Sequence, residues 1–275
     1  MRQGFHRTGG RVMAKQRHMT NDERSTEDAR LLMTSAGEAQ FLHTDTWRVL
    51  RIMGEFVEGF EALAEIGPAV TIFGSARIGE SDPMYQDATE TARQLGEAGY
   101  TIITGGGPGI MEAGNRGARE AGARSVGLNI ELPFEQHSNP YVDIEVDFRY
   151  FFVRKTMLVK YAQAFVIFPG GFGTFDELFE ALVLVQTGKV RNFPIILYQS
   201  SYWQGLIDWI RATALPSGKI ASADLDLLIL CDTPTQIRET IQACHKQNSG
   251  RNEQEARARA AVSYTHLTLP TNREV

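Results

Sequence analysis

Short apolar runs alternate with amphipathic stretches along most of this chain, and this alternation constrains the fold more than any other feature. The apolar runs predict strands at residues 69–73, 100–104, 125–130, 142–146, 164–168, 193–198 and 227–231. The stretches between them predict helices at residues 83–98, 110–121, 150–161, 174–187, 202–214 and 234–246. Strands that alternate with helices of about 10 to 15 residues form βαβ units with parallel strands. The sequence therefore predicts an α/β protein, a single domain with a Rossmann-like parallel sheet and helices on both faces.

The domain is predicted to span residues 43–247 and to begin with an amphipathic helix over residues 43–66. Residues 1–42 are polar and aperiodic, which predicts a disordered leader or an over-extended gene start; their basic first twenty residues leave a transit peptide open as an alternative. Residues 248–275 predict a disordered tail, and the last of them resemble translated sequencing-adapter read-through. We therefore leave both ends out of the functional argument.

Composition excludes several classes of function. The formal net charge of -5 gives no electrostatic footprint for nucleic acid, so a nucleic-acid partner is not expected. No apolar run approaches the roughly 20 residues of a membrane helix, so no membrane partner is expected. The two cysteines have neither zinc nor redox spacing, and no cluster has metal-ligand spacing. We expect a cytoplasmic protein with no metal and no cofactor.

The first glycine-rich loop spans residues 104–109, between a predicted strand and a predicted helix. Its glycines Gly106, Gly107 and Gly109 let the backbone turn with positive φ and approach a ligand closely. The helix start then offers unpaired N–H groups and a positive dipole end to an anion. The loop lacks the G-x-G-x-x-G spacing of dinucleotide-binding proteins, which disfavours NAD. A tight turn without a ligand is the alternative.

The second glycine-rich loop, residues 169–174, also joins a predicted strand to a predicted helix. Its candidate phosphate-binding residues are Gly170, Gly171, Gly173 and Thr174. A carboxylate beside a phosphate repels it, so Glu177 in the following turn suggests chemistry at a neighbouring atom. Thr174-x-x-Glu177 also fits a capping box, in which Glu177 only binds the amide of the N-cap residue. The spacing leaves both interpretations open.

A basic pair, Arg154 and Lys155, lies near the start of the helix predicted at residues 150–161. Two cations at the edge of a sheet could neutralise a substrate phosphate, and arginine in particular can bind its oxygens bidentately. A solvated helix face that carries charges without a ligand is the alternative.

Three blocks, at residues 105–113, 152–155 and 169–177, resemble the LONELY GUY (LOG) family of cytokinin-activating phosphoribohydrolases, often mislabelled lysine decarboxylases. The P-G-G-x-G-T-x-x-E pattern of the third block is highly specific for this family. The resemblance covers roughly residues 43–247 and is closer to the bacterial branch than to the short plant enzymes. It implies a Rossmann-like fold, a homodimer with the site near the subunit interface, and no cofactor or metal.

The resemblance also implies hydrolysis of the N-glycosidic bond of a nucleoside 5′-monophosphate to free base and ribose 5-phosphate. The usual substrates of the family are cytokinin riboside monophosphates and AMP. By matching position, Arg154 and Glu177 become the catalytic pair and Lys155 flanks the site. The same matching makes phosphate and ribose binders of Gly170, Gly171, Gly173 and Thr174.

Two positions depart from the plant-type pattern. Gln136 stands where ungapped counting places a family glutamate, and Val183 stands where plant-type members have a threonine. Both lie where the base would be recognised, so they bear on cytokinin specificity more than on the type of reaction. Phe172 could pack against the base or belong to the core. A non-catalytic nucleotide-binding module on the same fold, or another Rossmann-fold enzyme, are the rival functions.

Overall fold

The structure is a computed structural model that describes residues 26–32, 40–132, 137–191 and 193–247. Its centre is a sheet of seven strands in the order β4-β3-β2-β1-β5-β6-β7, with every neighbouring pair parallel. The strands are β1 (Ala69–Phe73), β2 (Thr101–Thr104), β3 (Ser125–Ile130), β4 (Ile144–Phe148), β5 (Ala162–Ile167), β6 (Ile195–Tyr198) and β7 (Leu228–Cys231). The predicted α/β class and parallel Rossmann-like sheet are confirmed.

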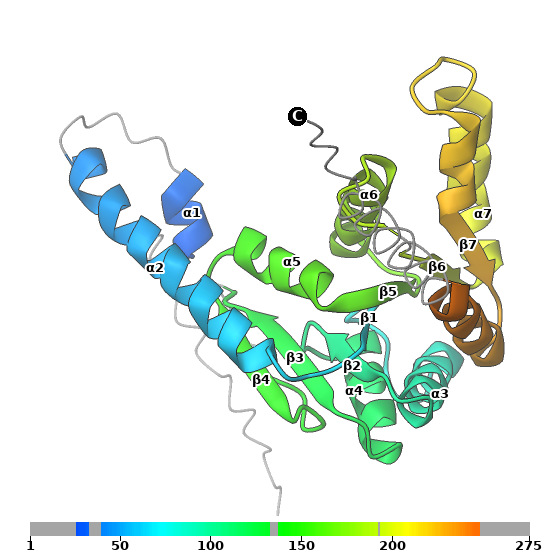
Figure 1. Ribbon diagram of the computed structural model, residues 1–275, viewed down its shortest axis with the longest axis horizontal. Coiled ribbons are helices and arrows are strands. Elements are labelled where there is room, and N and C mark those ends of the chain that lie inside the picture. The colour runs from blue at the N-terminus through cyan, green and yellow to red at the C-terminus, as the bar shows by residue number, and fades with distance from the viewer. Residues whose placement is uncertain (1–25, 33–39, 133–136, 192, 248–275) are drawn as a thin grey trace, which may run out of the picture.

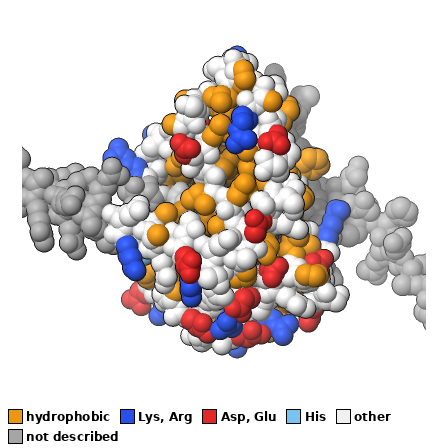
Figure 2. Space-filling model, turned by 90° about the vertical axis from the view of Figure 1, so that its right-hand side faces the viewer, with side chains coloured by type: hydrophobic (Ala, Val, Ile, Leu, Met, Phe, Trp, Pro, Cys, Tyr) orange, Lys and Arg blue, Asp and Glu red, His pale blue; other side chains and the backbone are white. Residues whose placement is uncertain are grey.

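Helices cover both faces of this sheet (Figure 1). They are α1 (Glu27–Leu32), α2 (Gln40–Leu63), α3 (Pro83–Glu97), α4 (Ile110–Glu120), α5 (Phe151–Lys160), α6 (Phe172–Gln186), α7 (Ser200–Trp209) and a last helix at residues 234–247. A π-helical turn, Ile210–Ala214, continues α7, and a 3₁₀ helix, Ser222–Leu227, precedes β7. Figure 2 shows the side that carries α7 and β7, where apolar side chains lie among charged ones.

Side chains of the central strands alternate between two cores, one on each face. In β1, Ala69 and Phe73 join the core formed with α2, α5, α6 and α7, whereas Val70 and Ile72 join the core formed with α3, α4 and the last helix. All five residues of β1 are buried. Burial on both faces explains why the strands read as continuous apolar runs rather than as alternating ones.

Part of the predicted leader, Glu27–Leu32, forms a helix in the structure. Asp28 of α1 accepts a hydrogen bond from the amide of Phe151 at 3.0 Å, and Glu55 of α2 accepts one from the amide of Arg149 at 3.2 Å. Because the first amides of a helix lack internal acceptors, Asp28 caps α5, while Glu55 holds the residue that leads into it. The rest of the predicted leader up to residue 39 lies outside the described residues, as does the predicted tail over residues 248–275.

The order of the strands creates a switch point between β1 and β5. The chain moves outward from β1 through β2 and β3 to β4, then returns to β5 on the other side of β1. In open α/β sheets, ligands bind beyond the carboxyl ends of the strands at such a point. The loops after β1, β2 and β5 therefore meet where a binding site is expected.

Candidate functional site

The loop after β1 joins the two predicted glycine loops. The amide of Ser75 donates to the carbonyl oxygen of Pro169 at 3.1 Å, and the carbonyl oxygen of Ser75 accepts from the amide of Ile110 at 3.0 Å. Ser75 thus contacts the second loop on one side and the start of α4 on the other. The sequence motifs did not include this residue; the available signal was its place just after a predicted strand.

The first loop requires glycine at two positions, and the side chain of Asn139 binds its backbone. Gly106 and Gly109 have φ angles of 73° and 70°, and a Cβ at either position would collide with Asn129 or with the carbonyl of Ser75, respectively. The Asn139 side-chain amide donates to the carbonyl oxygens of Gly106 and Gly107 at 2.9 and 3.0 Å. These contacts restrict the conformations that the loop can adopt.

Part of the hydrogen-bonding capacity of the first loop is already used internally. The amide of Gly106 donates to Thr104 Oγ1 at 3.0 Å, and the amide of Ile110 donates to Ser75. Thr104 in turn donates to the buried side chain of Asn115 at 2.6 Å. These bonds favour a scaffolding role for Gly106 rather than direct contact with a ligand.

The second loop starts its helix earlier than the capping-box interpretation requires. Gly171 is the N-cap of α6, and no side chain caps the helix. Thr174 is then the third helical residue, and its amide donates to the carbonyl of Gly171 at 2.9 Å. Glu177 lies one turn further along, on the buried side of α6. The capping-box interpretation of Thr174 and Glu177 is therefore wrong, and it no longer accounts for the carboxylate.

The amides at the start of α6 are the candidate anion-binding groups of this loop. Phe172 and Gly173, the first two helical residues, have no carbonyl acceptor within the helix. Gly171 and Gly173 are exposed, with open space where a side chain would lie. Gly170 is instead packed, since a Cβ there would collide with the side chain of Thr174. Of the predicted phosphate-binding glycines, Gly171 and Gly173 are therefore open to a ligand, whereas Gly170 is packed against the protein.

Arg154 and Glu177 are brought together at the carboxyl edge of the sheet. Arg154 extends from α5 toward the first loop, where its Nη2 atom lies 2.7 Å from the position that a Cβ on Gly105 would take. Glu177 extends from α6 and is only 8% exposed. Among the described residues, neither Arg154 Nε nor Glu177 Oε2 has a hydrogen-bond partner, although both atoms are buried. Buried polar atoms without partners are costly and point to a ligand.

Burial dominates the acid–base behaviour of this pair. It raises the pKa of the Glu177 carboxyl to about 7, and the positive charges of Lys155 and Arg154 reduce that shift. Burial also lowers the pKa of Arg154, against the opposing effect of the Glu177 charge. A carboxyl group whose pKa lies near neutrality can take up or release a proton at working pH.

Lys155 is engaged by neighbouring carboxylates of α6. Its Nζ atom lies 2.7 Å from Asp176 Oδ2 and 2.9 Å from Glu180 Oε2. Lys155 thus links α5 to α6 through two carboxylates, one before and one after Glu177 in the sequence. Binding of a phosphate by Lys155, as predicted, would therefore compete with these two ion pairs.

The remaining predicted positions lie apart from the buried pair. Phe172 is 96% exposed, so its proposed core role is wrong. Val183 is exposed on α6 and lines an apolar groove with Trp209. Gln136 lies outside the described residues. Among the residues that the structure describes, no group of three or more His, Cys, Asp or Glu could hold a metal, and no helix is long and apolar enough to cross a membrane.

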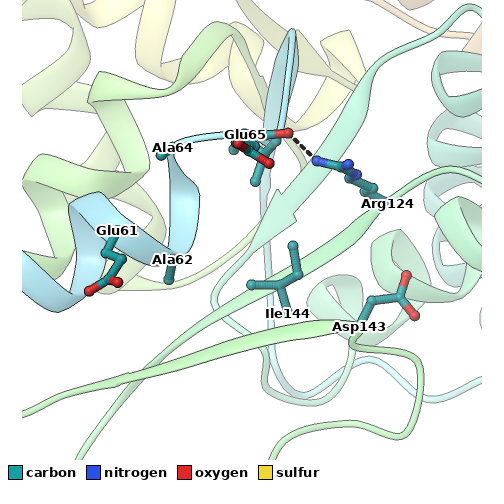
Figure 3. A pocket seen from close by; sticks show the side chains of 8 residues that line it. Glu61, Ala62, Ala64, Glu65, Arg124, Asp143 and Ile144 are labelled. Carbon is teal, nitrogen blue, oxygen red and sulfur yellow. Dashed lines mark hydrogen bonds between the residues drawn. The ribbon is translucent and has the colours of Figure 1, made fainter.

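A separate hollow of about 710 Å³ lies at the opposite edge of the sheet, between the end of α2 and the starts of β3 and β4 (Figure 3). Arg124 in this hollow donates to the carbonyl oxygen of Glu65. Asp143 accepts from the amide of Ser125 at 3.1 Å and pairs with Arg119. Because these polar groups already have partners, the hollow is a weaker candidate than the edge with Arg154 and Glu177.

The chain is similar in sequence to one family of known proteins. The model of a family described as "Possible lysine decarboxylase" matches residues 111–241, which include Arg154 and Glu177. A probable cytokinin riboside 5′-monophosphate phosphoribohydrolase of Oryza sativa subsp. japonica is 28% identical over 177 residues, 62% of this chain and 76% of that protein. A cytokinin riboside 5′-monophosphate phosphoribohydrolase of Mycobacterium tuberculosis is 26% identical over 171 residues, 60% of this chain and 89% of that protein.

A solved structure shares the fold. An X-ray structure of a structural-genomics target aligns with a TM-score of 0.50 and 24% identity, and the alignment covers 64% of this chain and 99% of that one. This likeness supports the parallel α/β architecture, while the two sequence relatives carry the functional comparison.

Proposed function

The chain belongs to the LONELY GUY (LOG) family, and from this premise we propose that it hydrolyses the N-glycosidic bond of nucleoside 5′-monophosphates. Water adds to the anomeric carbon, and the products are the free base and ribose 5-phosphate. Cytokinin riboside monophosphates and AMP are the proposed substrates. The observation that carries the proposal is the pair of Arg154 and the buried Glu177, each with a buried polar atom that lacks a partner, at the switch point of the sheet.

In this proposal Glu177 performs the chemistry at the sugar. N-glycoside hydrolysis passes through a cationic sugar that resembles an oxocarbenium ion. A carboxylate held in a buried position stabilises that charge strongly, and it also orients or deprotonates the attacking water. The pKa of about 7 leaves a substantial ionised fraction at neutral pH.

The remaining residues hold and orient the nucleotide. The free amides at the start of α6, with Gly171, Gly173 and Thr174, bind the 5′-phosphate and ribose, since a helix N-terminus favours an anion. Arg154 supplies its charge to the phosphate or to the departing base. The first loop, with Gly107 and Gly109, forms the opposite wall, and binding energy from the phosphate positions the reacting carbon.

A panel of nucleotides tests this function. We expect AMP and cytokinin riboside monophosphates to release free base, measured by chromatography. The matching nucleosides should react at least about 100-fold more slowly, because they lack the phosphate that the α6 amides bind. Tight binding of nucleotides without release of base from any of them would instead identify a non-catalytic binding module. Equal rates for nucleotide and nucleoside would contradict the phosphate role of α6.

We also propose a homodimer formed through the outer face of α6. Phe179 and Val183 are exposed there and line an apolar groove of about 200 Å³ with Trp209. Glu177 lies on the buried face of the same helix, so a partner at this groove would pack against the helix that carries the candidate site. Exposed apolar patches of this kind mark interfaces.

The dimer is tested by placing a charge in the groove. We expect Phe179→Glu to halve the mass of the assembly in sedimentation equilibrium, because an unpaired charge would be buried at the interface. Leu32→Glu, at an exposed apolar residue of α1, serves as the matched control and should leave the mass unchanged. An unchanged mass for Phe179→Glu would place the interface elsewhere.

A further inference from the structure

The buried residue Asn139 holds the backbone of the first glycine-rich loop at two peptide groups. Asn139 is 8% exposed, and its side-chain amide donates to the carbonyl oxygens of Gly106 and Gly107 at 2.9 and 3.0 Å. Its backbone amide also donates to the Gly106 carbonyl oxygen at 2.9 Å. The Gly106 oxygen thus has two donors from one residue, and both carbonyl groups point toward Asn139.

The direction of the Gly106 carbonyl also fixes the direction of the next N–H group. The peptide bond between Gly106 and Gly107 is trans and planar, so its C=O and N–H point in opposite directions. The N–H of Gly107 therefore points away from Asn139. No residue in the part of the chain that the structure describes accepts a hydrogen bond from it. Gly107 is buried, and a buried amide without an acceptor points to a ligand.

The neighbours of Gly107 in the loop do not offer a second donor of this kind. The carbonyl of Gly107 is also held by Asn139, but the next residue is Pro108, which has no N–H group. The amide of Gly106 is already used, since it donates to Thr104 Oγ1 at 3.0 Å. Of the two peptide groups that Asn139 holds, only the one between Gly106 and Gly107 therefore directs a donor outward.

A buried network fixes the orientation of the Asn139 side chain. The side-chain oxygen of Asn115 accepts from the Asn139 amide at 2.9 Å and from the Thr104 hydroxyl at 2.6 Å. The amide of Asn115 donates to the Ser125 hydroxyl at 2.8 Å. The side-chain oxygen of Asn139 accepts from the backbone amide of Tyr141 at 3.1 Å. Both ends of the Asn139 amide thus have partners, so it cannot rotate without breaking buried hydrogen bonds.

The position of the loop indicates which part of a nucleotide the Gly107 amide would meet. Ser75 contacts both glycine-rich loops, since its amide donates to Pro169 and its carbonyl oxygen accepts from Ile110. A single residue therefore bridges the first loop and the loop that leads to the candidate anion-binding amides of α6. Backbone N–H groups that converge from loops form binding sites for anions, and a phosphate has enough acceptor oxygens for donors from two sides.

From these contacts we infer that Asn139 is a positioning residue, which directs the Gly107 N–H toward the sugar-phosphate half of a bound nucleotide. The inference rests on the proposed function for the identity of the ligand. It goes beyond that function because Asn139 lies outside the three sequence blocks and acts only through the backbone of the first loop, with Asn115 as its support.

Binding measurements test this role separately from turnover. In the Glu177→Gln background, calorimetry gives the Kd of AMP and that of ribose 5-phosphate. We expect Asn139→Ala to raise both Kd values about tenfold, as the weakening of one hydrogen bond to a charged group would. With Glu177 present, Asn139→Ala should raise the KM for AMP by a similar factor and leave kcat nearly unchanged. The reason is that the contact is made equally in the substrate complex and in the transition state.

Ser125→Ala is the matched control. It removes a hydrogen bond from the same buried network, at Asn115, but leaves the bonds from Asn139 to the loop in place. The midpoint of its urea unfolding should fall, while the Kd and KM for AMP should not change. The control therefore separates a loss of stability from a loss of the Gly107 contact.

Three results would overturn the inference: unchanged Kd values in Asn139→Ala, a lower kcat at unchanged KM, or weaker binding of AMP but not of ribose 5-phosphate. If Asn139→Ala does not fold, the amide signal of Gly107 in the NMR spectrum of the Glu177→Gln chain decides. It should shift when AMP is added, and a signal that stays in place would contradict the contact. Binding of AMP without hydrolysis by the unmodified chain would refute the proposed reaction alone, whereas absence of AMP binding would refute both.

Discussion

Replacing Glu177 by glutamine is expected to lower the rate of base release by roughly 10³-fold, within the range found when a general base or a charge-stabilising group is removed. Glutamine has nearly the same shape but carries no charge and cannot accept a proton. Nucleotide binding should persist, because the proposed site holds the phosphate by amides at the start of α6 rather than by this carboxylate. Chromatography measures the release of base, and calorimetry measures the binding of AMP.

Glu180→Gln is the matched control for this variant. Glu180 lies about one turn further along α6 and pairs with Lys155 at 2.9 Å, at the helix surface rather than in the buried position. We expect less than about a tenfold loss of rate, since a partly exposed ion pair contributes little. Equal losses in the two variants would show that negative charge on α6 in general, rather than the Glu177 carboxylate, supports the reaction.

The periodic part of the fold was predictable from the sequence because its cause is local. Strands buried on both faces must be apolar throughout, and helices between them must be amphipathic, so the pattern reports the sheet directly. The exact bounds were less certain. The strand predicted at residues 142–146 is Ile144–Phe148, and the helix predicted at residues 202–214 is α7 followed by a π-helical turn.

The errors occurred where a contact distant in the sequence decides the local structure. Threonine followed by glutamate three residues later resembles a capping box, but α6 begins at Phe172, where Gly170 packs against Thr174 and the loop after β1. Helix α1 was missed because its reason to be ordered is Asp28, which caps a helix more than 120 residues further on. Such pairings leave no periodic signal in either segment.

The placement of the site residues was only partly predictable. Arg154 and Glu177 come from the motifs, but their burial and their unpartnered atoms follow from the topology, which brings α5 and α6 to the same edge. Lys155 was expected near a phosphate because it follows Arg154 in the sequence. On a helix, neighbouring residues point about 100° apart, and Lys155 therefore reaches Asp176 and Glu180 instead.

The same Glu177→Gln substitution should stabilise the folded protein, and the gain should grow with pH. The carboxyl has an ordinary pKa of 4.5, which burial raises to about 7 in the folded chain. Its protonated form is therefore favoured by folding, so this group costs no stability below about pH 4.5. Between pH 4.5 and about 7 the unfolded chain releases this proton while the folded chain keeps it, so stability is lost over that range, and the loss is complete once the folded carboxyl ionises above pH 7. Glutamine stays neutral throughout and avoids that loss.

This pKa shift makes the expected free energy of unfolding of the glutamine variant about 3 kcal/mol larger at pH 8. The difference is expected to be small at pH 5. Urea unfolding of both proteins at the two pH values, without nucleotide, measures it. Any change in packing from the amide group adds the same free energy at both pH values. Growth of the stability difference with pH therefore identifies ionisation as its cause. A difference that stays constant from pH 5 to pH 8 would mean that Glu177 is already ionised in the folded chain at pH 5. The protein would then hold its catalytic charge without a stability cost, and the unpartnered oxygen of Glu177 would have to be solvated rather than reserved for substrate.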